Sequence, residues 1–272
     1  MSAAVQAGLA RACASLSAVL ERGGVDVMRL AEDLFGLSDI AAGDPRLRRS
    51  LTDPGRSAQE RGTLAEEAFG AHVLPQTLEV VRDIVAEHWS DPMDLHEALE
   101  VLGITATLED ARSAGRLEDV EHELFGVSEL LGANRELRDA LSDMGAGTPH
   151  ERGVLAVDVF GPHLSRWAMR LVRRGVARTS HGRLLWTLRR FCDRAADMRG
   201  CAFATVEAAR PLTDAQTERL RSVVSAQLGR EASLNITVDP SLVGGFRVRS
   251  GTTSIDSSVS ARVAELRRAL TH

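Results

Sequence analysis

The sequence contains no lysine and no tyrosine, and only 4% of its residues are aromatic. The lack of lysine excludes a phosphate-binding loop of the Walker type, because that loop needs a lysine beside the phosphates. With so little aromatic area, the core of this 272-residue chain must rest on leucine, valine and alanine. Hydrophobic residues still make up 44% of the chain, as in ordinary globular proteins, and the length allows more than one domain.

Residues that build catalytic and metal centres are also sparse. The three cysteines, Cys13, Cys192 and Cys201, are odd in number and far apart, which favours neither a disulfide framework nor a metal site. The eight histidines form no H-x-x-x-H or Cys/His ligand set, and no G-x-S-x-G nucleophile motif occurs. We therefore expect no catalytic residue, no cofactor and no metal ligand.

Long hydrophobic runs are missing as well. No apolar stretch approaches the ~20 residues that cross a membrane, and no signal peptide opens the chain. The sequence therefore predicts an intracellular protein without a direct membrane span.

Charge is distributed unevenly along the chain, whose net charge is −5. Residues 1–97 carry 9 arginines against 16 acidic residues, and residues 198–272 carry 10 against 7. From Arg166 to Arg194, nine arginines accompany one acidic residue, Asp193. This stretch is either a solvated helix face or a docking surface for an acidic partner. Nucleic acid is not an expected partner, since no nucleic-acid motif accompanies the arginines.

The N-terminal two-thirds of the chain is duplicated. Residues 34–72 match residues 124–163 at an offset of 90 and then, after a one-residue insertion, of 91, with 17 identities. The matched blocks include Leu34-Phe35-Gly36 with Leu124-Phe125-Gly126, Glu60-Arg61-Gly62 with Glu151-Arg152-Gly153, and His72 with His163. The period exceeds the 20–50 residues of solenoid repeats, so each copy is expected to be a small bundle of short helices.

The last quarter of the chain has a different pattern. Residues 202–206 and 234–238 are predicted strands, and Thr213 is a predicted N-cap of a helix that ends at Leu228 before Gly229. Strand signals resume at Phe246 and Val248, Ser250-Gly251 is a predicted tight turn, and a last strand leads to Ile255. An apolar stripe of Val259, Val263, Leu266 and Leu270 predicts a final helix. The predicted order is β-α-β-β-α.

These patterns predict an α+β protein that is mostly α. We expect two tandem helical bundles, residues 1–97 and 98–197, followed by a small β-α-β-β-α domain at 198–272. The pair Gly244-Gly245 is expected to shape a turn, because phosphate loops place their glycines before a helix and here a strand follows.

Three motifs in the last quarter closely resemble the C-terminal signature of the delta subunit of F-type ATP synthase, the bacterial relative of the mitochondrial oligomycin-sensitivity protein. The signature residues are Pro211, Leu212, Gln216, Asp239, Pro240, Leu242, Gly244, Gly245, Ile255, Asp256 and Ser258. One departure is Ser257, where the family usually has glycine. Residues 98–272 resemble an ordinary delta subunit, and residues 1–97 resemble an extra helical copy, as in the subunits of actinobacteria.

The resemblance implies a non-catalytic coupling subunit of the ATP synthase stator. Its helical bundle would bind the N-terminal helices of the alpha subunits, and its C-terminal region would bind the peripheral-stalk b subunit at the cytoplasmic face of the plasma membrane. By analogy, Leu102, Trp167 and Leu171 are the expected anchors for the alpha-subunit helix. The alternatives are a helical adaptor unrelated to ATP synthase and an enzyme that binds a phosphate ligand at the Gly-Gly turn.

Two smaller expectations concern side-chain environments. The acidic run of Glu118, Asp119, Glu121 and Glu123 alternates with apolar residues, which predicts the wet face of an amphipathic helix. Trp89, Trp167 and Trp186 are expected to be core residues or to line a groove, because they occur in apolar or amphipathic segments.

Overall fold

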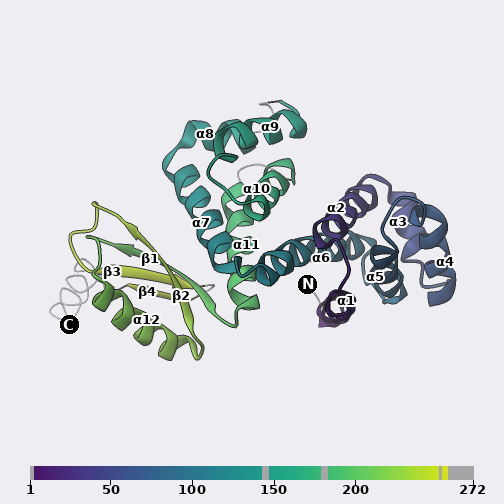
Figure 1. Cartoon of the computed structure of the whole chain (residues 1–272), viewed down its shortest axis with the longest axis horizontal. Coiled ribbons are helices and arrows are strands. Elements are labelled where there is room, and N and C mark those ends of the chain that lie inside the picture. Colours follow the sequence, from purple (N-terminus) through teal and green to yellow (C-terminus); the bar gives the residue numbers. More distant parts are fainter. Residues whose placement is uncertain (1–2, 143–146, 179–182, 251–252, 257–272) are drawn as a thin grey trace, which may run out of the picture. The chain divides into compact units, whose positions relative to one another are not determined.

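A computed structural model describes residues 3–142, 147–178, 183–250 and 253–256. The chain divides into two compact units, Met1–Arg116 and Leu117–His272. The first is helical in its described part, and the second combines helices with a sheet (Figure 1). The expected fold class, α+β and mostly α, is confirmed.

The first unit contains the first helical copy. Its helices are α1 (Ala3–Glu21), α2 (Val27–Gly43), α3 (Pro45–Leu51), α4 (Ala58–Phe69), α5 (Pro75–Ala86) and α6 (Pro92–Ser113). Helix α2 packs along α6, α4 packs on α5, and α1 contacts both α5 and α6. Helices α2 and α6 approach closely at Gly103 on α6, which faces the buried ring of Phe35 on α2.

The helices of the second copy belong to the second unit. They are α7 (Leu117–Ala133), α8 (Arg135–Ser142), α9 (Pro149–Phe160), α10 (Arg166–Arg178) and α11 (Leu184–Met198). Helix α7 packs on α11 and α9 packs on α10, which repeats the pairing of α2 with α6 and of α4 with α5. The sequence repeat is therefore also a repeat of helix packing.

The two copies begin equivalent helices in the same way. The side chain of Ser57 caps α4 and that of Thr148 caps α9, each in a capping box with the glutamate three residues later. The backbone N–H of the cap residue donates to that glutamate and lowers the pKa of both Glu60 and Glu151. Equivalent capping residues therefore begin equivalent helices in the two copies.

A second shared device joins distant helices. The carboxylate of Asp33 accepts hydrogen bonds from the N–H of Leu74 and the hydroxyl of Thr77, and so holds the start of α5. In the second copy Glu123 takes this place, and it accepts from both the N–H and the hydroxyl of Ser165 before α10. Glutamate is one methylene longer than aspartate, yet each carboxylate accepts a backbone N–H and a hydroxyl at the start of the equivalent helix.

The expected domain boundaries fall at two different kinds of position. Helix α6 runs through the boundary expected between residues 97 and 98, since neither glycine nor proline interrupts it there. The boundary expected between 197 and 198 lies at the end of α11, shortly before the first strand. The division into domains 1–97, 98–197 and 198–272 stays a prediction.

The C-terminal region is a four-stranded sheet with one described helix. Its elements are β1 (Ala202–Ala208), α12 (Asp214–Leu228), β2 (Ala232–Val238), β3 (Phe246–Ser250) and β4 (Thr253–Asp256). The spatial order is β2-β1-β3-β4, with β1 parallel to β2 and the other pairs antiparallel. The parallel pair needs a crossover, and α12 supplies it. The described residues form four strands where the expected order has three, because β3 and β4 are separate strands that pair antiparallel.

The two faces of this sheet have different neighbours. Ala204, Val206, Leu234 and Val248 pack with Leu220 and Val224 of α12 on one face. Residues at alternate positions, such as Phe203 and Ser233, contact helix α7 on the other face. The expected final helix with its stripe from Val259 to Leu270 lies outside the described residues.

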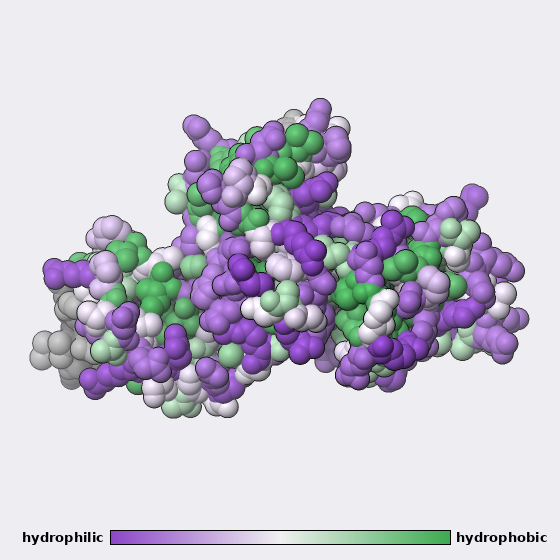
Figure 2. Space-filling model, in the orientation of Figure 1, coloured by the Kyte–Doolittle hydropathy of each residue, from purple (hydrophilic) through white to green (hydrophobic). Residues whose placement is uncertain are grey.

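The surface is largely hydrophilic on the face shown in Figure 2, with apolar patches between the polar residues, including over the C-terminal sheet. Among the helices that the structure describes, none is long and apolar enough to cross a membrane.

Candidate functional site

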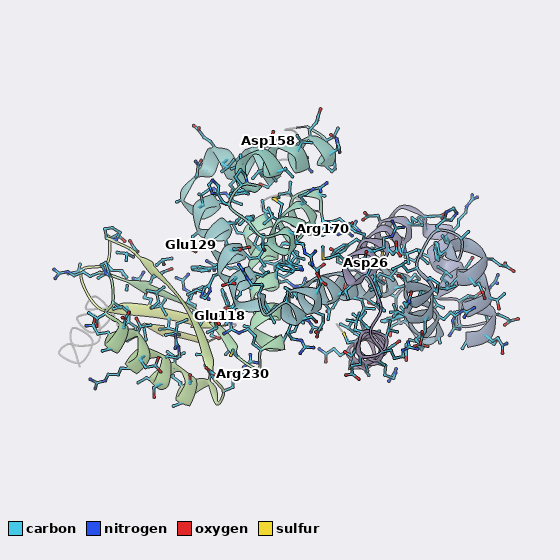
Figure 3. All side chains as sticks on the ribbon, viewed as in Figure 1. Asp26, Glu118, Glu129, Asp158, Arg170 and Arg230 are labelled. Atoms are coloured by element: carbon cyan, nitrogen blue, oxygen red, sulfur yellow. The ribbon has the colours of Figure 1, made fainter. Side chains whose placement is uncertain are left out.

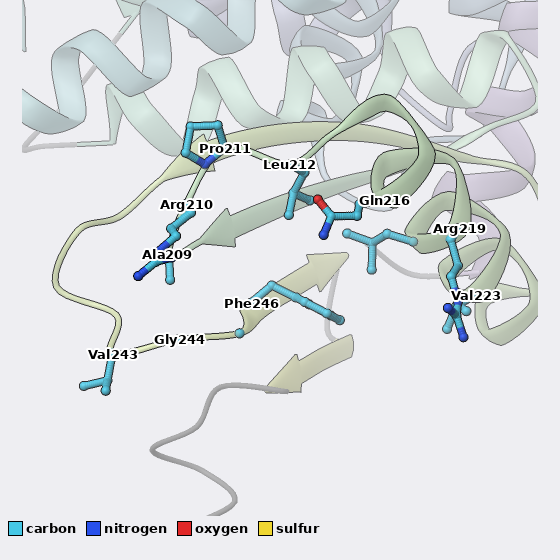
Figure 4. Close-up of a pocket in the computed structure, with 12 residues that line it drawn as sticks. Ala209, Arg210, Pro211, Leu212, Gln216, Arg219, Val223, Val243, Gly244 and Phe246 are labelled. Atoms are coloured by element: carbon cyan, nitrogen blue, oxygen red, sulfur yellow. The ribbon is translucent and has the colours of Figure 1, made fainter.

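An apolar pocket of about 570 Å³ lies beside α12 in the second unit (Figure 4). Three segments form it: the loop after β1, the first turns of α12, and the loop that leads into β3. Its lining residues are Ala209, Arg210, Pro211, Leu212, Gln216, Arg219, Leu220, Val223, Val243, Gly244, Gly245 and Phe246. Five of the predicted signature residues line this pocket, although they come from two segments about 30 residues apart in sequence.

The pocket combines an apolar floor with a basic rim. Leu220 is buried, Leu212 and Phe246 are partly buried, and Val223 and Val243 are 56% and 81% exposed. Arg210 and Arg219 are exposed at the edge. Such a surface suits a ligand with apolar side chains and negative charge, for example one end of an acidic amphipathic helix.

Two of the signature elements shape the pocket through the backbone. The side-chain oxygen of Gln216 accepts the backbone N–H of Thr213 at 2.9 Å, and the backbone N–H of Gln216 donates to the Thr213 hydroxyl. Together these bonds form a capping box at the start of α12. Gly245 has φ 82°, in the left-handed region that favours glycine, and leads directly into β3. The Gly-Gly pair is therefore a turn between strands, as the sequence predicted.

The other signature residues build the turn after β2 and the last strand. The carboxylate of Asp239 accepts the N–H of Ser241 at 2.9 Å, and hydrogen bonds from Ser241 lower the pKa of Asp239. Pro240 is exposed in this turn, and Leu242 is buried beneath it. In the β3–β4 register, Ile255 is opposite Val248 and Asp256 is opposite Arg247. Ser258 lies outside the described residues.

The three predicted anchors occupy different environments. Trp167 and Leu171 are one turn apart on α10, while Leu102 is on α6 of the first unit. Leu102 and Leu171 are completely buried, whereas Trp167 is partly exposed and carries the guanidinium of Arg166 over its ring at 4.6 Å. Of the three, Trp167 is the residue with surface that a partner helix could contact.

The structure excludes the core alternative for Trp186 and shows that the expectation for Glu121 was wrong. Trp186 is 56% exposed, because the buried stripe of α11 follows Leu184, Leu188 and Phe191 on the opposite side of the helix. Glu121 is completely buried, so the acidic run of α7 is not a uniform wet face. A signal for Glu121 was present in the sequence: it is spaced four residues from Leu117 and three from Leu124, both on the apolar stripe.

Few of the described side chains are suited to catalysis or metal binding. Among the described residues, no group of three or more His, Cys, Asp and Glu side chains could hold a metal ion. Burial raises the pKa of the Cys192 thiol well above its usual value, which opposes thiolate formation. The two repeat-equivalent histidines lie in the same kind of turn: the backbone N–H groups of His72 and His163 donate to the carbonyls of Phe69 and Phe160.

The family model of the ATP synthase delta (OSCP) subunit matches residues 105–270. The ATP synthase subunit delta of Parafrankia sp. is 37% identical over 246 residues, which cover 90% of this chain and 88% of the relative. That of Kineococcus radiotolerans is 34% identical over 275 residues and covers 99% of both chains, so its match includes the first helical copy.

Among solved structures, a chain of the Toxoplasma gondii mitochondrial ATP synthase hexamer is 19% identical and matches 62% of this chain with a TM-score of 0.37, too distant a likeness to carry an argument. The sequence comparisons are decisive by themselves, because the family model spans more than half of the chain and relatives above 30% identity cover most of it. The chain belongs to the ATP synthase delta (OSCP) subunit family, a family of non-catalytic subunits of that complex.

Proposed function

We propose that this chain is the coupling subunit of the stator of a proton-driven ATP synthase, which holds the catalytic head against the torque of the rotor. Its helical part would bind the N-terminal helices of the alpha subunits, and its C-terminal domain would bind the end of the peripheral-stalk b subunit. The protein would then be peripheral, at the cytoplasmic face of the plasma membrane.

The observation that carries the C-terminal half of this proposal is the convergence of signature residues on one pocket. Pro211, Leu212, Gln216, Gly244 and Gly245 all line it, and they are joined there by the exposed apolar side chain of Val223. The rim arginines, Arg210 and Arg219, favour a stalk helix that ends in apolar and acidic residues.

The helical half rests on the exposed part of α10. Trp167 is the proposed anchor with accessible surface, and the buried Leu171, one turn away, would support α10 beneath a partner helix. Leu102 is buried on α6 of the first unit and would act there only by supporting α6 itself. An aromatic side chain with a guanidinium over it offers a large, rigid contact area, which is typical of strongly contributing interface residues.

The test of the stalk site replaces Val223 by aspartate in the full chain. Burying a valine side chain contributes about 1.5–3 kcal/mol, and aspartate would add a desolvation penalty, so binding of a soluble peptide from the C-terminal end of the stalk b protein should weaken at least about tenfold. The matched control is Val154→Asp on α9, because Val154 is 47% exposed and lies away from the pocket. Titration of both variants with this stalk peptide decides the matter, and unchanged binding by Val223→Asp would refute the site.

A further inference from the structure

Glu121 is a buried carboxylate where helix α7 meets the C-terminal sheet. Its side chain is completely buried, although Glu118, one turn earlier (Figure 3), and Asp119 are exposed. A carboxylate is almost never fully buried unless charged or hydrogen-bonding groups compensate for its lost hydration. The partners of Glu121 therefore indicate what the residue does.

Both carboxylate oxygens of Glu121 are occupied. Arg199 Nη1 donates to Oε2 at 2.9 Å, Ser233 Oγ donates to Oε1 at 2.6 Å, and Asn235 Nδ2 donates to Oε1 at 3.1 Å. Arg199 follows the last residue of α11, while Ser233 and Asn235 are alternate residues of β2 and share one face of the sheet. One side chain thus joins α7 to the end of α11 and to the sheet.

The repeat shows that helix packing alone does not need this carboxylate. The equivalent of Glu121 in the first copy is Ala31, which is also completely buried. The apolar positions around it are kept in both copies, as Leu30 and Val120, Leu34 and Leu124, and Phe35 and Phe125. Glu121 therefore occurs in the second copy, which the sheet follows, at the helix position that contacts this sheet.

Apolar and surface contacts accompany the network. The ring of Phe125 packs edge-on against Phe203 of β1, with centroids 6.0 Å apart. An exposed ion pair also links the last turn of α11 to the loop before β2: Arg230 Nη1 lies 2.7 Å from Asp197 Oδ1. Apolar contacts tolerate small sliding movements, whereas three directed bonds to one carboxylate hold a single register.

We propose that Glu121 is a positioning residue that locks the C-terminal sheet to the second helical copy, so that the two transmit force as one body. The force-bearing part of this inference rests on the proposed stator function, while the lock itself does not. In a subunit that holds the catalytic head against torque, movement at this junction would reduce the force transmitted between the stalk-binding and head-binding ends.

The lock is tested first in the free full chain. Glu121→Ala should speed amide hydrogen exchange of β2 and of the first turns of α7 at least tenfold, while α9 and α12 keep their wild-type exchange. Glu118→Ala is the matched control, because Glu118 is an exposed glutamate of the same helix and also approaches Arg199, at 3.3 Å. Wild-type exchange at β2 in Glu121→Ala would overturn the lock.

Glu121→Gln is a second variant that distinguishes local loosening of the junction from a general loss of folding. Glutamine keeps the acceptor for Ser233 and Asn235 and removes the charge that faces Arg199. It should loosen the junction less than alanine does and leave the circular dichroism of the chain unchanged. Equal loosening in both variants with unchanged dichroism would assign the lock to the Arg199 pair alone and would overturn the three-partner arrangement.

The force-bearing role is tested in reconstituted ATP synthase. With Glu121→Ala, ATP hydrolysis should be maintained while ATP-driven proton pumping falls at least twofold, and Glu118→Ala should pump as wild type does. Full pumping by a chain whose junction is loose would overturn the role in force transmission. Failure of the wild-type chain to restore pumping would instead contradict the proposed stator function, and it would leave the hydrogen-exchange result standing.

Discussion

The contact between helices α2 and α6 offers a sharp test of packing in the first unit. A Cβ atom added at Gly103 would lie 2.7 Å from Cδ1 and Cε1 of Phe35, closer than real Cβ contacts. Phe35 is only 1% exposed, so its ring is enclosed by the core and does not face solvent. Gly36 is the natural comparison, since it is an exposed glycine within α2 and a Cβ there meets nothing within 4 Å.

The two glycine-to-alanine substitutions should have opposite effects. Alanine at either position gains about 1 kcal/mol of helix propensity. At Gly103 the added methyl group also overpacks the interface, which typically costs 1–3 kcal/mol, or about 2 here. Gly36→Ala should therefore stabilise the first unit by about 1 kcal/mol and Gly103→Ala should destabilise it by about 1 kcal/mol.

Native-state hydrogen exchange of the full chain measures this difference locally, without assuming that a chain of two compact units unfolds in one step. The gap of about 2 kcal/mol corresponds to a roughly 30-fold difference in the opening constants of α2 and α6 between the two variants. If Gly103→Ala protects these helices as well as Gly36→Ala does, the close approach of Phe35 to α6 is wrong.

Two further predictions concern a partner site and a helix cap. Trp167→Ala should weaken binding of the alpha-subunit N-terminal peptide at least tenfold in a titration. Trp186→Ala is the control, because it also removes a tryptophan with an arginine over its ring, and it should leave binding unchanged. Equal losses of affinity in the two variants would place the anchor elsewhere. The bond from the Thr148 N–H lowers the pKa of Glu151, so the stability that this carboxylate contributes is complete above its unfolded pKa of about 4.3 and is lost as pH falls through the lower folded value. Glu151→Gln should reduce the acid-dependent loss of α9 helix in a dichroism titration, and the same pH slope in both proteins would contradict this assignment.

Much of the fold followed from local spacing. Thr213 with Gln216 and Thr148 with Glu151 specify helix starts, because a capping box involves residues only three positions apart. The last strand predicted to lead to Ile255, after a tight turn at Ser250-Gly251, is present as β4, although Gly251 lies outside the described residues. Helix α6 passes a predicted boundary because a repeat in sequence need not coincide with a break in the backbone.

The candidate site was predicted in part. The signature named Pro211, Leu212 and the Gly-Gly pair, but not that they meet Val223 and Phe246 around one hollow. The burial of Glu121 was missed because acidic residues are usually solvated, although its spacing from Leu117 and Leu124 placed it on the apolar stripe. Its bonding partners become visible only in the tertiary structure.

By itself, the sequence determined the family, the duplication and both ends of α12, because these depend on residue identity and on spacings of a few positions. Only the tertiary structure decided which distant groups meet: Ser233 reaches Glu121 across 112 positions, and two loops about 30 residues apart enclose one pocket. The physical reason is that such contacts depend on strand order and on the face that each helix presents to the sheet, which local spacing does not encode.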